Sequence, residues 1–533
     1  MRIWPMEDPA RRVAALLVDA VRRGGSDMVF GVPGGGPNLA LIGAAEEAGL
    51  RFVLSHGETA AAITASTYGL LTGAPSMAIA TRGPGAASTI NGVAQATLDR
   101  APLVFVSDCV PSSETERVAH QRIDQVALLT PVTKWSGRLG GDGAAGEVAG
   151  AAVQLAGTAP RGAVHLDFDP GAPSSQPPPR SPVDASGADE FERARALLAE
   201  STLPVVIVGV GAVDEAVRVR SVLEAFGCPV LTTYQAAGVL PEGHRQLAGL
   251  YTGGIIENRV LDAADLIFTV GLDTVEPIPA PWRQTVPVVS LDVAAPDSTF
   301  VPATVALRTP LLAELFERVT AGAGHEWAPN AGGLAIARAR AALLECTRGT
   351  FGPLELSTAI AQLAPTGTTA TVDAGAHFLA IMPFWPAMTA NSLLISNGLA
   401  TMGFALPAAI GAALARPGRP VVCMTGDGGL GMTLAELETV ARLELPITIV
   451  VFDDAALSLI EIKQQAAQGG HGAVRYTPID FAAIGRAVGL DAASVDSVVD
   501  LESVLADGWD RGRVIDARID ASSYAALLKT TRG

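Results

Sequence analysis

Aspartates follow two neighbouring apolar runs in the stretch MTGDGGLGMTLAELETVARLELPITIVVFDDAALSLI, residues 424–460. Asp427 stands between two glycines directly after the first run, and Asp453 and Asp454 follow the second run. Carboxylate oxygens are the ligands that Mg²⁺ prefers, and neighbouring glycines let a backbone turn tightly and approach a bulky anion. If the two acidic positions meet in space, they are suited to hold a divalent cation beside a diphosphate group.

The elements around these aspartates predict that they do meet. We expect a strand over 420–425, a helix over 433–443 and a second strand over 446–452. Such a unit is nearly always a right-handed crossover between parallel strands, so both strands end at one edge of the sheet, where α/β proteins bind ligands. This places Asp427 beside Asp454. Two ordinary strand-end turns are the alternative, because Asp and Gly are common turn residues.

The same alternation of strands and helices runs through almost the whole chain, which predicts an α/β fold with three doubly wound parallel-sheet domains. A segment rich in Pro, Ser and Gly, at 169–190, cannot form a helix or a strand and reads as a linker. We therefore expect an N-terminal domain over 1–170, a linker over 171–190, a central domain over 191–330 and a C-terminal domain over 350–533.

Composition excludes several classes of protein. The chain has 533 residues, of which 49% are hydrophobic and 17% charged, so it can bury large cores and is not disordered. Its formal net charge of −17 argues against nucleic acid or an anionic membrane as the main partner. The four cysteines are far apart in the sequence, which disfavours a zinc site, a CxxC redox motif or a secreted disulfide framework.

We find no sequence signal for secretion or for membrane insertion. Its N-terminus, MRIWPMEDPARR, has no long apolar core of the kind found in signal peptides. No apolar run approaches the roughly 18 residues needed to span a bilayer. We expect a soluble cytoplasmic protein.

With these motifs on view, the sequence resembles the thiamine diphosphate-dependent enzymes. Their shared motif is GDG followed, one crossover later, by an Asn-containing pair. The family's magnesium ligands are the Asp of GDG, the second residue of the pair and a backbone carbonyl two residues further on, which the resemblance carries to Asp427, Asp454 and Ala456. Here the pair is Asp453-Asp454, and this departure adds negative charge beside the diphosphate.

The resemblance covers nearly the whole chain and is most extensive for the acetolactate synthase, or acetohydroxyacid synthase, large-subunit group. The segment HGETAAAITASTYGLLTG aligns Glu58 with the catalytic glutamate of the family, and AHQRIDQVALLTPVTKW aligns Gln121 with an active-site glutamine. In DAGAHF, His377 would reach the diphosphate. In SNGLATMGFALPAAIGAAL, Met402 falls on the residue that props the cofactor into its bent shape.

The resemblance therefore implies a full set of site residues. Those implied to be catalytic are Glu58, Gln121 and Gly35, the last in the glycine turn of VFGVPGGGPN. Those implied to bind the cofactor are Pro33, Glu58, Gly375, His377, Thr401, Met402, Gly426, Asp427, Gly428, Gly429, Asp454, Ala456, Leu457 and Ser458.

The implied reaction is the decarboxylation of a 2-oxo acid with carboligation of the remaining fragment to a second carbonyl. Glu58 would hydrogen-bond a ring nitrogen of thiamine diphosphate, Gly35 would lie beside the reacting carbon, and Gln121 would hydrogen-bond the substrate. The plainer alternatives are a first-turn helix glutamate favoured by the helix dipole, an ordinary glycine turn and a surface glutamine. The family also implies a homodimer or homotetramer with active sites at the subunit interface.

Two stretches leave the exact reaction open, and a third is a near match to another motif. The stretch after Asp454 lacks the Trp that the synthases carry there. The stretch VGLDTVEPIPAPW, 270–282, lacks the Arg of flavin-binding members, which makes FAD a doubtful cofactor. GVGAVDE, 209–215, begins like a dinucleotide fingerprint but lacks its third glycine, and we interpret it as a tight strand–helix turn. A specialised 2-oxo acid decarboxylase, an aldehyde carboligase or lyase, and a non-catalytic cofactor-binding homologue are the alternatives.

Overall fold

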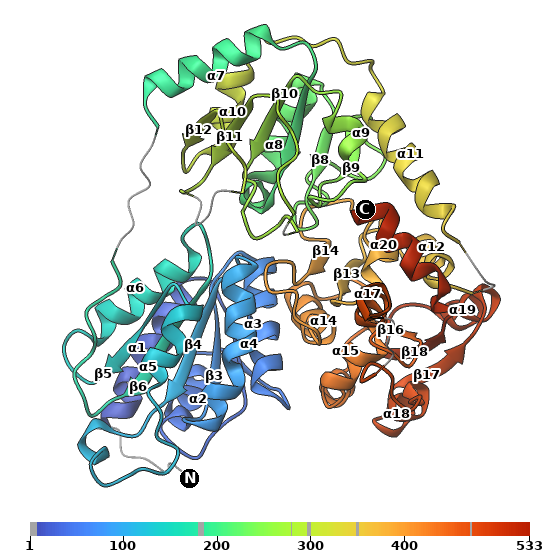
Figure 1. The fold of residues 1–533 in the computed structure, drawn as a ribbon. Coiled ribbons are helices and arrows are strands. Elements are labelled where there is room, and N and C mark those ends of the chain that lie inside the picture. Colours follow the sequence, from blue (N-terminus) through green and yellow to red (C-terminus); the bar gives the residue numbers. More distant parts are fainter. Residues whose placement is uncertain (1–7, 180–185, 279, 296–299, 348–350, 469–471) are drawn as a thin grey trace. The chain divides into compact units, whose positions relative to one another are not determined.

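Three parallel six-stranded sheets organise the computed structural model of this chain, which confirms the expected α/β class (Figure 1). The structure describes residues 8–179, 186–278, 280–295, 300–347, 351–468 and 472–533. The chain forms two compact units. The first comprises Met1–Ser181, Gly398–Gly418 and Met432–Ile447, and the second comprises Pro182–Asn397, Arg419–Gly431 and Thr448–Gly533.

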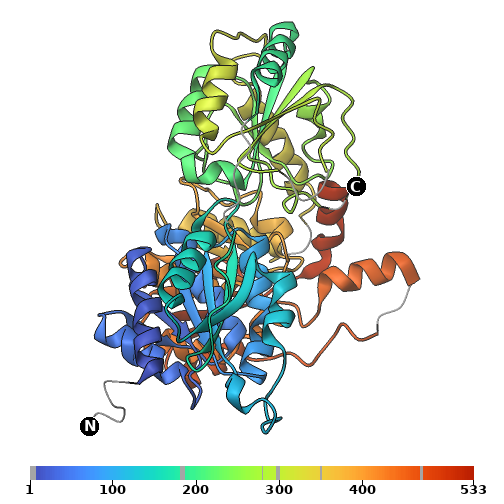
Figure 2. The same cartoon turned by 90° about the vertical axis from the view of Figure 1, so that its left-hand side faces the viewer.

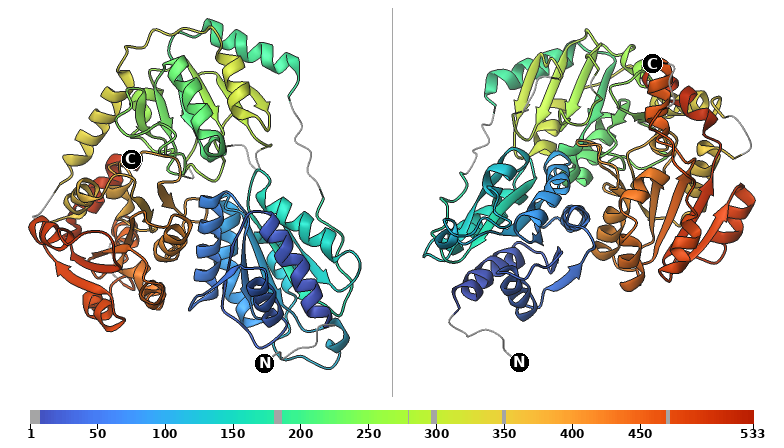
Figure 3. Two further views of the ribbon diagram at one scale, coloured as in Figure 1. Left: turned by 180° about the vertical axis from the view of Figure 1, so that it is seen from behind. Right: turned by 60° about the horizontal axis from the view of Figure 1, so that its bottom comes forward.

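The first sheet lies in the first unit and has helices on both faces (Figures 1 and 3). Its strands, in spatial order, are β2 (Arg51–Leu54), β1 (Met28–Gly31), β3 (Ser76–Ala80), β4 (Leu103–Asp108), β6 (Ala163–Asp169) and β5 (Trp135–Gly140). One face is covered by α1 (Pro9–Arg23), α2 (Asn38–Glu47) and α6 (Ala145–Gly157). The other carries α3 (Glu58–Thr72), α4 (Pro84–Leu98) and α5 (Gln125–Leu129), with short turns η1 (Ser112–Glu114) and η2 (Thr130–Val132) in the connections.

Two helices from the C-terminal third of the chain belong to the first unit as well. They are α14 (Ala405–Ala415) and α16 (Glu436–Arg442), and α14 packs against α3. The contact is close at Gly411, where an added Cβ would lie 2.5 Å from the carbonyl oxygen of Thr64. Small residues on both helices therefore bring their backbones together.

The central sheet lies in the second unit. Its strands, in spatial order, are β12 (Val305–Arg308), β11 (Val288–Asp292), β10 (Leu266–Val270), β7 (Pro204–Val208), β8 (Val230–Thr232) and β9 (Leu247–Leu250). On one face lie α7 (Ala188–Glu200), α8 (Ala216–Phe226) and α10 (Leu312–Thr320), as Figure 2 shows for α8 and α10. On the other lie α9 (Asn258–Leu261) and α11 (Ala331–Leu344), and η3 (Val210–Glu215) follows β7.

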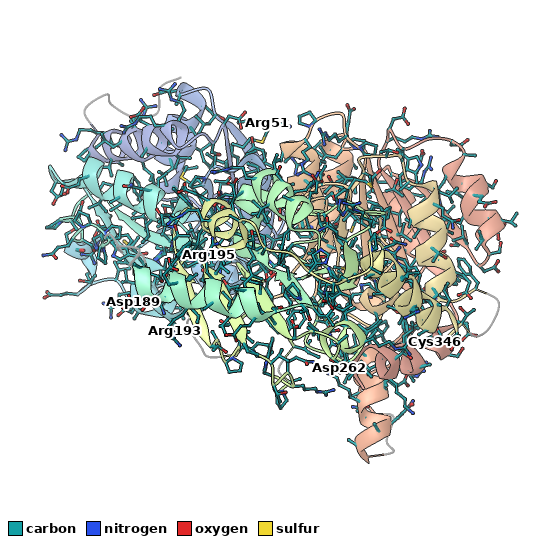
Figure 4. All side chains as sticks on the ribbon, turned by 90° about the horizontal axis from the view of Figure 1, so that it is seen from above. Arg51, Asp189, Arg193, Arg195, Asp262 and Cys346 are labelled. Carbon is teal, nitrogen blue, oxygen red and sulfur yellow. The ribbon has the colours of Figure 1, made fainter. Side chains whose placement is uncertain are left out.

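Helix α7 presents charged residues to solvent, among them Asp189, Arg193 and Arg195, which Figure 4 labels. Arg195 donates from its guanidinium to the carbonyl of Arg318 on α10 at 2.9 Å. This bond fixes the two helices to one another at the surface of the sheet.

The third sheet also lies in the second unit. Its strands, in spatial order, are β14 (Leu393–Ile395), β13 (Thr369–Val372), β15 (Val421–Gly426), β16 (Ile447–Asp453), β18 (Arg513–Arg518) and β17 (Asp491–Val495). Its helices are α12 (Pro353–Leu363), α13 (Phe378–Ile381), α15 (Asp427–Met432), α17 (Ser458–Gln468), α18 (Phe481–Ala487), α19 (Val498–Leu505) and α20 (Tyr524–Arg532), with η4 (Ala521–Ser523) before α20. Among the described residues, no helix is both long and apolar enough to cross a membrane.

The strand orders reveal how the sheets are related. Numbered within its own sheet, the first follows 2-1-3-4-6-5, and so does the third. The central sheet follows 3-2-1-4-5-6, the order of dinucleotide-binding sheets. In each case the order reverses beside the first strand, so a crevice forms at that point.

Helices α3 and α4 meet at Gly92, where close packing leads to a prediction. A Cβ at Gly92 would lie 2.7 Å from both the Ala62 Cβ and the Thr59 carbonyl oxygen. We expect Gly92→Ala to lower the free energy of unfolding by about 1–3 kcal/mol through overpacking. Gly43→Ala on α2 is the matched control, because its Cβ meets nothing within 4 Å and alanine favours a helix by up to about 1 kcal/mol. Urea unfolding followed by circular dichroism measures both, and a Gly92→Ala protein as stable as the control would contradict this packing.

Candidate cofactor and metal site

The crossover from β15 to β16 brings the ends of these strands together at one edge of the third sheet. Asp427 is buried, and its Oδ2 accepts a hydrogen bond from the backbone N–H of Ala456 at 3.2 Å. Its Oδ1 accepts from the N–H of Gly428 at 2.6 Å. Asp427 is the first residue of the short helix α15, where the sequence had indicated only a turn.

Asp454 lies close enough to Asp427 for their charges to interact. Burial raises the pKa of both carboxyls, and the charge of Asp427 raises that of Asp454 further. The Ser458 hydroxyl donates to Asp454, and the Tyr476 hydroxyl donates to Asp427. Two partly desolvated carboxylates that repel each other form a site that a divalent cation would stabilise.

His377 faces the glycines at the same edge. Its ring stacks on Phe452, with 5.5 Å between the ring centroids, and burial lowers its pKa to about 4. A Cβ at Gly375 would lie 2.5 Å from the His377 Cε1, and one at Gly426 would lie 3.2 Å from it. Within the described part of the chain, the buried Nε2 of His377 has no hydrogen-bond partner. The His377 ring therefore requires glycine at both positions. Its buried nitrogen without a hydrogen-bond partner is compatible with a polar ligand at this position.

Asp373, which sequence reasoning did not single out, joins the two strands on either side of the reversal. It follows β13, and its Oδ2 accepts from the Thr425 hydroxyl at 2.9 Å. A Cβ at Gly429 would lie only 2.1 Å from that same oxygen. The available signal was its position in DAGAHF, since it is a third aspartate at a strand end. The crevice between β13 and β15 is thus the reversal point at which sheets of this kind bind ligands.

Glu58 lies in the first unit as the first residue of α3. Its Oε1 is 3.3 Å from where a Cβ on Gly85 would stand, so it faces the start of α4. The residues before it are held by Glu436, a buried carboxylate on α16. Oε1 of Glu436 accepts from the N–H groups of His56 at 2.9 Å and Gly57 at 3.1 Å. Glu436 lies inside the stretch that opened the sequence analysis, but nothing local in it indicates this distant contact.

The glycine turn after β1 is packed against polar groups on one side and open on the other. A Cβ at Gly36 would lie 2.6 Å from Oδ2 of Asp108, whose Oδ1 accepts from the Asn38 N–H at 2.8 Å. Burial raises the pKa of Asp108 to about 6. At Gly35 a Cβ would meet nothing within 4 Å, and Pro33 is exposed. The turn therefore leaves space beside Gly35 for another molecule.

Two glutamines meet the turn at Gly83, and they differ in burial. Gln121 is exposed with a φ of 56°, and its carbonyl oxygen would lie 2.7 Å from a Cβ on Gly83. Gln125 is buried, and its Oε1 accepts from the Gly83 N–H at 2.7 Å while its Nε2 donates to Asp167 at 2.6 Å. Gln125 thus fixes the turn, a role with no sequence signal beyond its place four residues after Gln121.

Thr401 and Met402 belong to the first unit. The Thr401 hydroxyl donates to Oδ1 of Asn91 on α4 at 2.9 Å, and Met402 is half-buried. Gly398, at the start of this segment, donates its N–H to Asp99 at 2.6 Å. The segment is therefore fixed on α4.

The structure divides the expected site residues into two groups. In the second unit it brings together Gly375, His377, Gly426, Asp427, Gly428, Gly429, Asp454, Ala456, Leu457 and Ser458. In the first unit lie Pro33, Gly35, Glu58, Gln121, Thr401 and Met402. Three or more His, Cys, Asp or Glu side chains able to hold a metal do not gather anywhere in the described ranges. The expected magnesium ligands include only two such side chains, together with one backbone carbonyl. The absence of a group of three side chains among the described residues therefore does not contradict them.

Comparison with known proteins matches all three sheets to one family. Residues 11–128 match the "Thiamine pyrophosphate enzyme, N-terminal TPP binding domain", residues 191–307 the central domain, and residues 373–516 the C-terminal TPP binding domain.

Relatives extend over nearly the full chain. Acetolactate synthase of Bacillus subtilis is 28% identical, across 97% of this chain and 94% of the relative. Catabolic acetolactate synthase of Raoultella terrigena is 28% identical, across 93% and 92%. The large subunit of acetolactate synthase isozyme 3 of Escherichia coli is 28% identical, across 98% and 97%. The chain is therefore an enzyme of the thiamine pyrophosphate family and is related to its acetolactate synthases.

Proposed function

We propose that this enzyme uses thiamine diphosphate and Mg²⁺ to decarboxylate a 2-oxo acid and to join the remaining fragment to a second carbonyl compound, as an acetolactate synthase does. The observation that carries the proposal is the convergence of Asp427, Asp454 and Ala456 at the ends of β15 and β16, in the domain that matches the C-terminal TPP binding domain. When bound, thiamine diphosphate supplies the carbanion chemistry that removes carbon dioxide and forms the new carbon–carbon bond.

In this proposal Asp427, Asp454 and the carbonyl of Ala456 hold Mg²⁺. Two carboxylates and a carbonyl are hard oxygen donors, and the remaining positions suit diphosphate oxygens and water. The cation also offsets the repulsion between the carboxylates, to which the replacement of the usual Asn by Asp453 adds. Ser458 and Leu457 complete this end of the site, since the Ser458 hydroxyl orients Asp454 and the Leu457 N–H donates to Val474 at 2.8 Å.

The glycines at 375, 426 and 429 leave room for the His377 ring and the Asp373 carboxylate, and with Gly428 they form the edge that the diphosphate is proposed to approach. The unpartnered Nε2 of His377, in a ring packed against Gly375 and Gly426, supports a polar contact to the bound cofactor. Asp373 orients the strand ends through its bond to Thr425.

Glu58 is proposed to share a proton with a nitrogen of the cofactor's pyrimidine ring. Its position at the start of α3, held through Glu436, supports a fixed carboxyl that can give and take this proton. Pro33, Thr401 and Met402 are proposed to contact the cofactor, Gly35 to leave room for substrate, and Gln121 to hydrogen-bond it.

The same site residues are compatible with other activities, which the experiments below distinguish. A specialised 2-oxo acid decarboxylase or an aldehyde carboligase or lyase would use the same residues with another acceptor. A non-catalytic homologue would bind the cofactor without turnover. We further propose that the enzyme acts in the cytoplasm on small-molecule substrates and binds neither nucleic acid nor a membrane.

The central experiment compares wild type with Glu58→Gln, using pyruvate, thiamine diphosphate and Mg²⁺. Proton NMR of acid-quenched mixtures identifies products, and calorimetry measures cofactor binding. We expect acetolactate from wild type, and a loss in turnover of at least about 100-fold in Glu58→Gln, because a proton-transfer group is removed. Cofactor affinity should change little, since the amide keeps the shape of the side chain.

The products distinguish the alternatives. Acetaldehyde or another carbonyl product in place of acetolactate would indicate a decarboxylase or a different ligation. If wild type and variant bind the cofactor equally and neither converts any of a panel of 2-oxo acids, the catalytic proposal is wrong and the binding-only reading holds.

The crowded position of Gly429 gives a second prediction. We expect Gly429→Ala to displace the Asp373 carboxylate, to weaken binding of thiamine diphosphate with Mg²⁺, and to lower the free energy of unfolding by about 1–3 kcal/mol. Gly431→Ala in the same helix is the control, because its Cβ meets nothing within 4 Å. Calorimetric titration and thermal unfolding measure both effects. Equal cofactor affinity in the two variants would refute the role of this crevice.

A third prediction concerns assembly. We propose a homodimer or homotetramer in which one subunit supplies Glu58 and another supplies Asp427 to each active site. Light scattering should then give at least a dimer. Two inactive variants, Glu58→Gln and Asp427→Ala, should regain part of the wild-type turnover when they are co-refolded, because mixed dimers contain one intact site. A fully active monomer, or mixtures that stay inactive although mixed oligomers form, would exclude this arrangement.

A further inference from the structure

The central sheet has the strand order of dinucleotide-binding domains, yet its crevice is occupied from within. The order reverses between β7 and β10, the point at which a sheet of this order binds the diphosphate of a dinucleotide. The turn after β7 begins at Gly209, and the turn after β10 begins at Gly271. The two turns touch, since the N–H of Gly211 donates to the carbonyl of Gly271 at 2.8 Å.

The side chain of Glu276 lies in this crevice. Its carboxyl accepts from the backbone N–H of Val210, with Oε1 at 3.1 Å and Oε2 at 3.0 Å. Oε2 also accepts from the N–H of Asp273 at 3.0 Å, and Oε1 accepts from the Thr233 hydroxyl at 2.5 Å. Only 4% of Glu276 is exposed. Donors that follow β7, β8 and β10 thus all point at one buried carboxyl.

The Glu276 side chain also fills the space of this crevice. A Cβ at Gly209 would lie 2.5 Å from Oε2 of Glu276 and 2.4 Å from the Cα of Leu272. In dinucleotide-binding sheets the glycine after the first strand leaves room for a phosphate, and the N–H groups of the following turn bind it. Here the Glu276 carboxyl fills the space beside Gly209 and accepts the N–H of Val210.

We propose that the Glu276 carboxyl takes the place of a phosphate in the central domain, so that this domain is liganded by its own side chain and binds neither flavin nor dinucleotide. The inference rests on the geometry of the central sheet alone, and it stands whether or not the proposed reaction is correct. It gives a physical reason for the doubt over FAD that the missing Arg raised.

The occupied crevice also has a structural use. The backbone carbonyl of Glu276 accepts from Nδ2 of Asn397 at 2.8 Å. Asn397 directly precedes the segment that carries Thr401 and Met402. The carboxyl therefore fixes a loop whose main chain in turn holds the side chain of Asn397.

The test uses the full-length protein loaded with thiamine diphosphate and excess Mg²⁺, so that the cofactor's own site is filled. Wild type, Glu276→Ala and Glu257→Ala are melted with and without inorganic phosphate. Glu257 is a matched control, because it is buried in the same domain and accepts backbone N–H groups from Thr252 and Gly254, outside the crevice. Both alanine variants should melt several degrees below wild type, as expected for lost buried hydrogen bonds.

The expected distinction is rescue by the anion. Phosphate should raise the melting temperature of Glu276→Ala and leave wild type and Glu257→Ala unchanged. A direct titration of wild type with FAD, followed by flavin fluorescence, should show no binding. The proposal is overturned if wild type retains or binds FAD, or if phosphate fails to act selectively on Glu276→Ala. If that variant does not fold, the wild-type titration, with Glu276→Gln as a variant that keeps the crevice filled, decides the question.

Discussion

Parallel strands all end at one edge of their sheet, and this constraint gathers buried carboxyl groups there in all three sheets of the enzyme. Asp108 is the last residue of β4 in the first sheet, Glu276 follows β10 in the central sheet, and Asp427 and Asp454 follow neighbouring strands in the third. Burying a carboxylate is costly unless donors or a cation compensate. How each sheet compensates determines what each domain can bind.

The compensation differs from sheet to sheet. The Asn38 N–H donates a hydrogen bond to Asp108, and three groups donate hydrogen bonds to Glu276. The protein itself therefore compensates these two buried carboxyls. Asp427 and Asp454 have donors as well, but the charge of Asp427 raises the pKa of Asp454, so the protein compensates these two carboxyls less completely. The first and third sheets share one strand order and still differ in this respect. The choice of side chains at the strand ends, and not the topology, therefore separates an edge whose carboxyl the protein satisfies from an edge with two interacting carboxyls.

Glycines set the second condition, because they determine how closely a group can approach these edges. At Gly429 and Gly209 a Cβ would collide with a carboxylate oxygen, so the residue type is fixed by packing. At Gly35 a Cβ would meet open space, so packing does not fix the residue type there. The crossover that joins β15 to β16 has one further effect. Its helix α16 carries Glu436, which holds the main chain just before Glu58.

The sequence by itself determined the alternating α/β pattern, the crossover that joins Asp427 to Asp454, and the family, because these depend on local periodicity, chirality and motifs of a few residues. Only the tertiary structure decided which distant polar groups hold the turns at the strand ends. Glu436 and His56 are 380 positions apart, and Glu276 reaches Val210 across 66 positions. Gln121 and Gln125 cannot be told apart by type, and burial alone makes Gln125 the one that fixes the Gly83 turn. Such contacts depend on how sheets and loops pack, and no pattern within a short window of sequence encodes that packing.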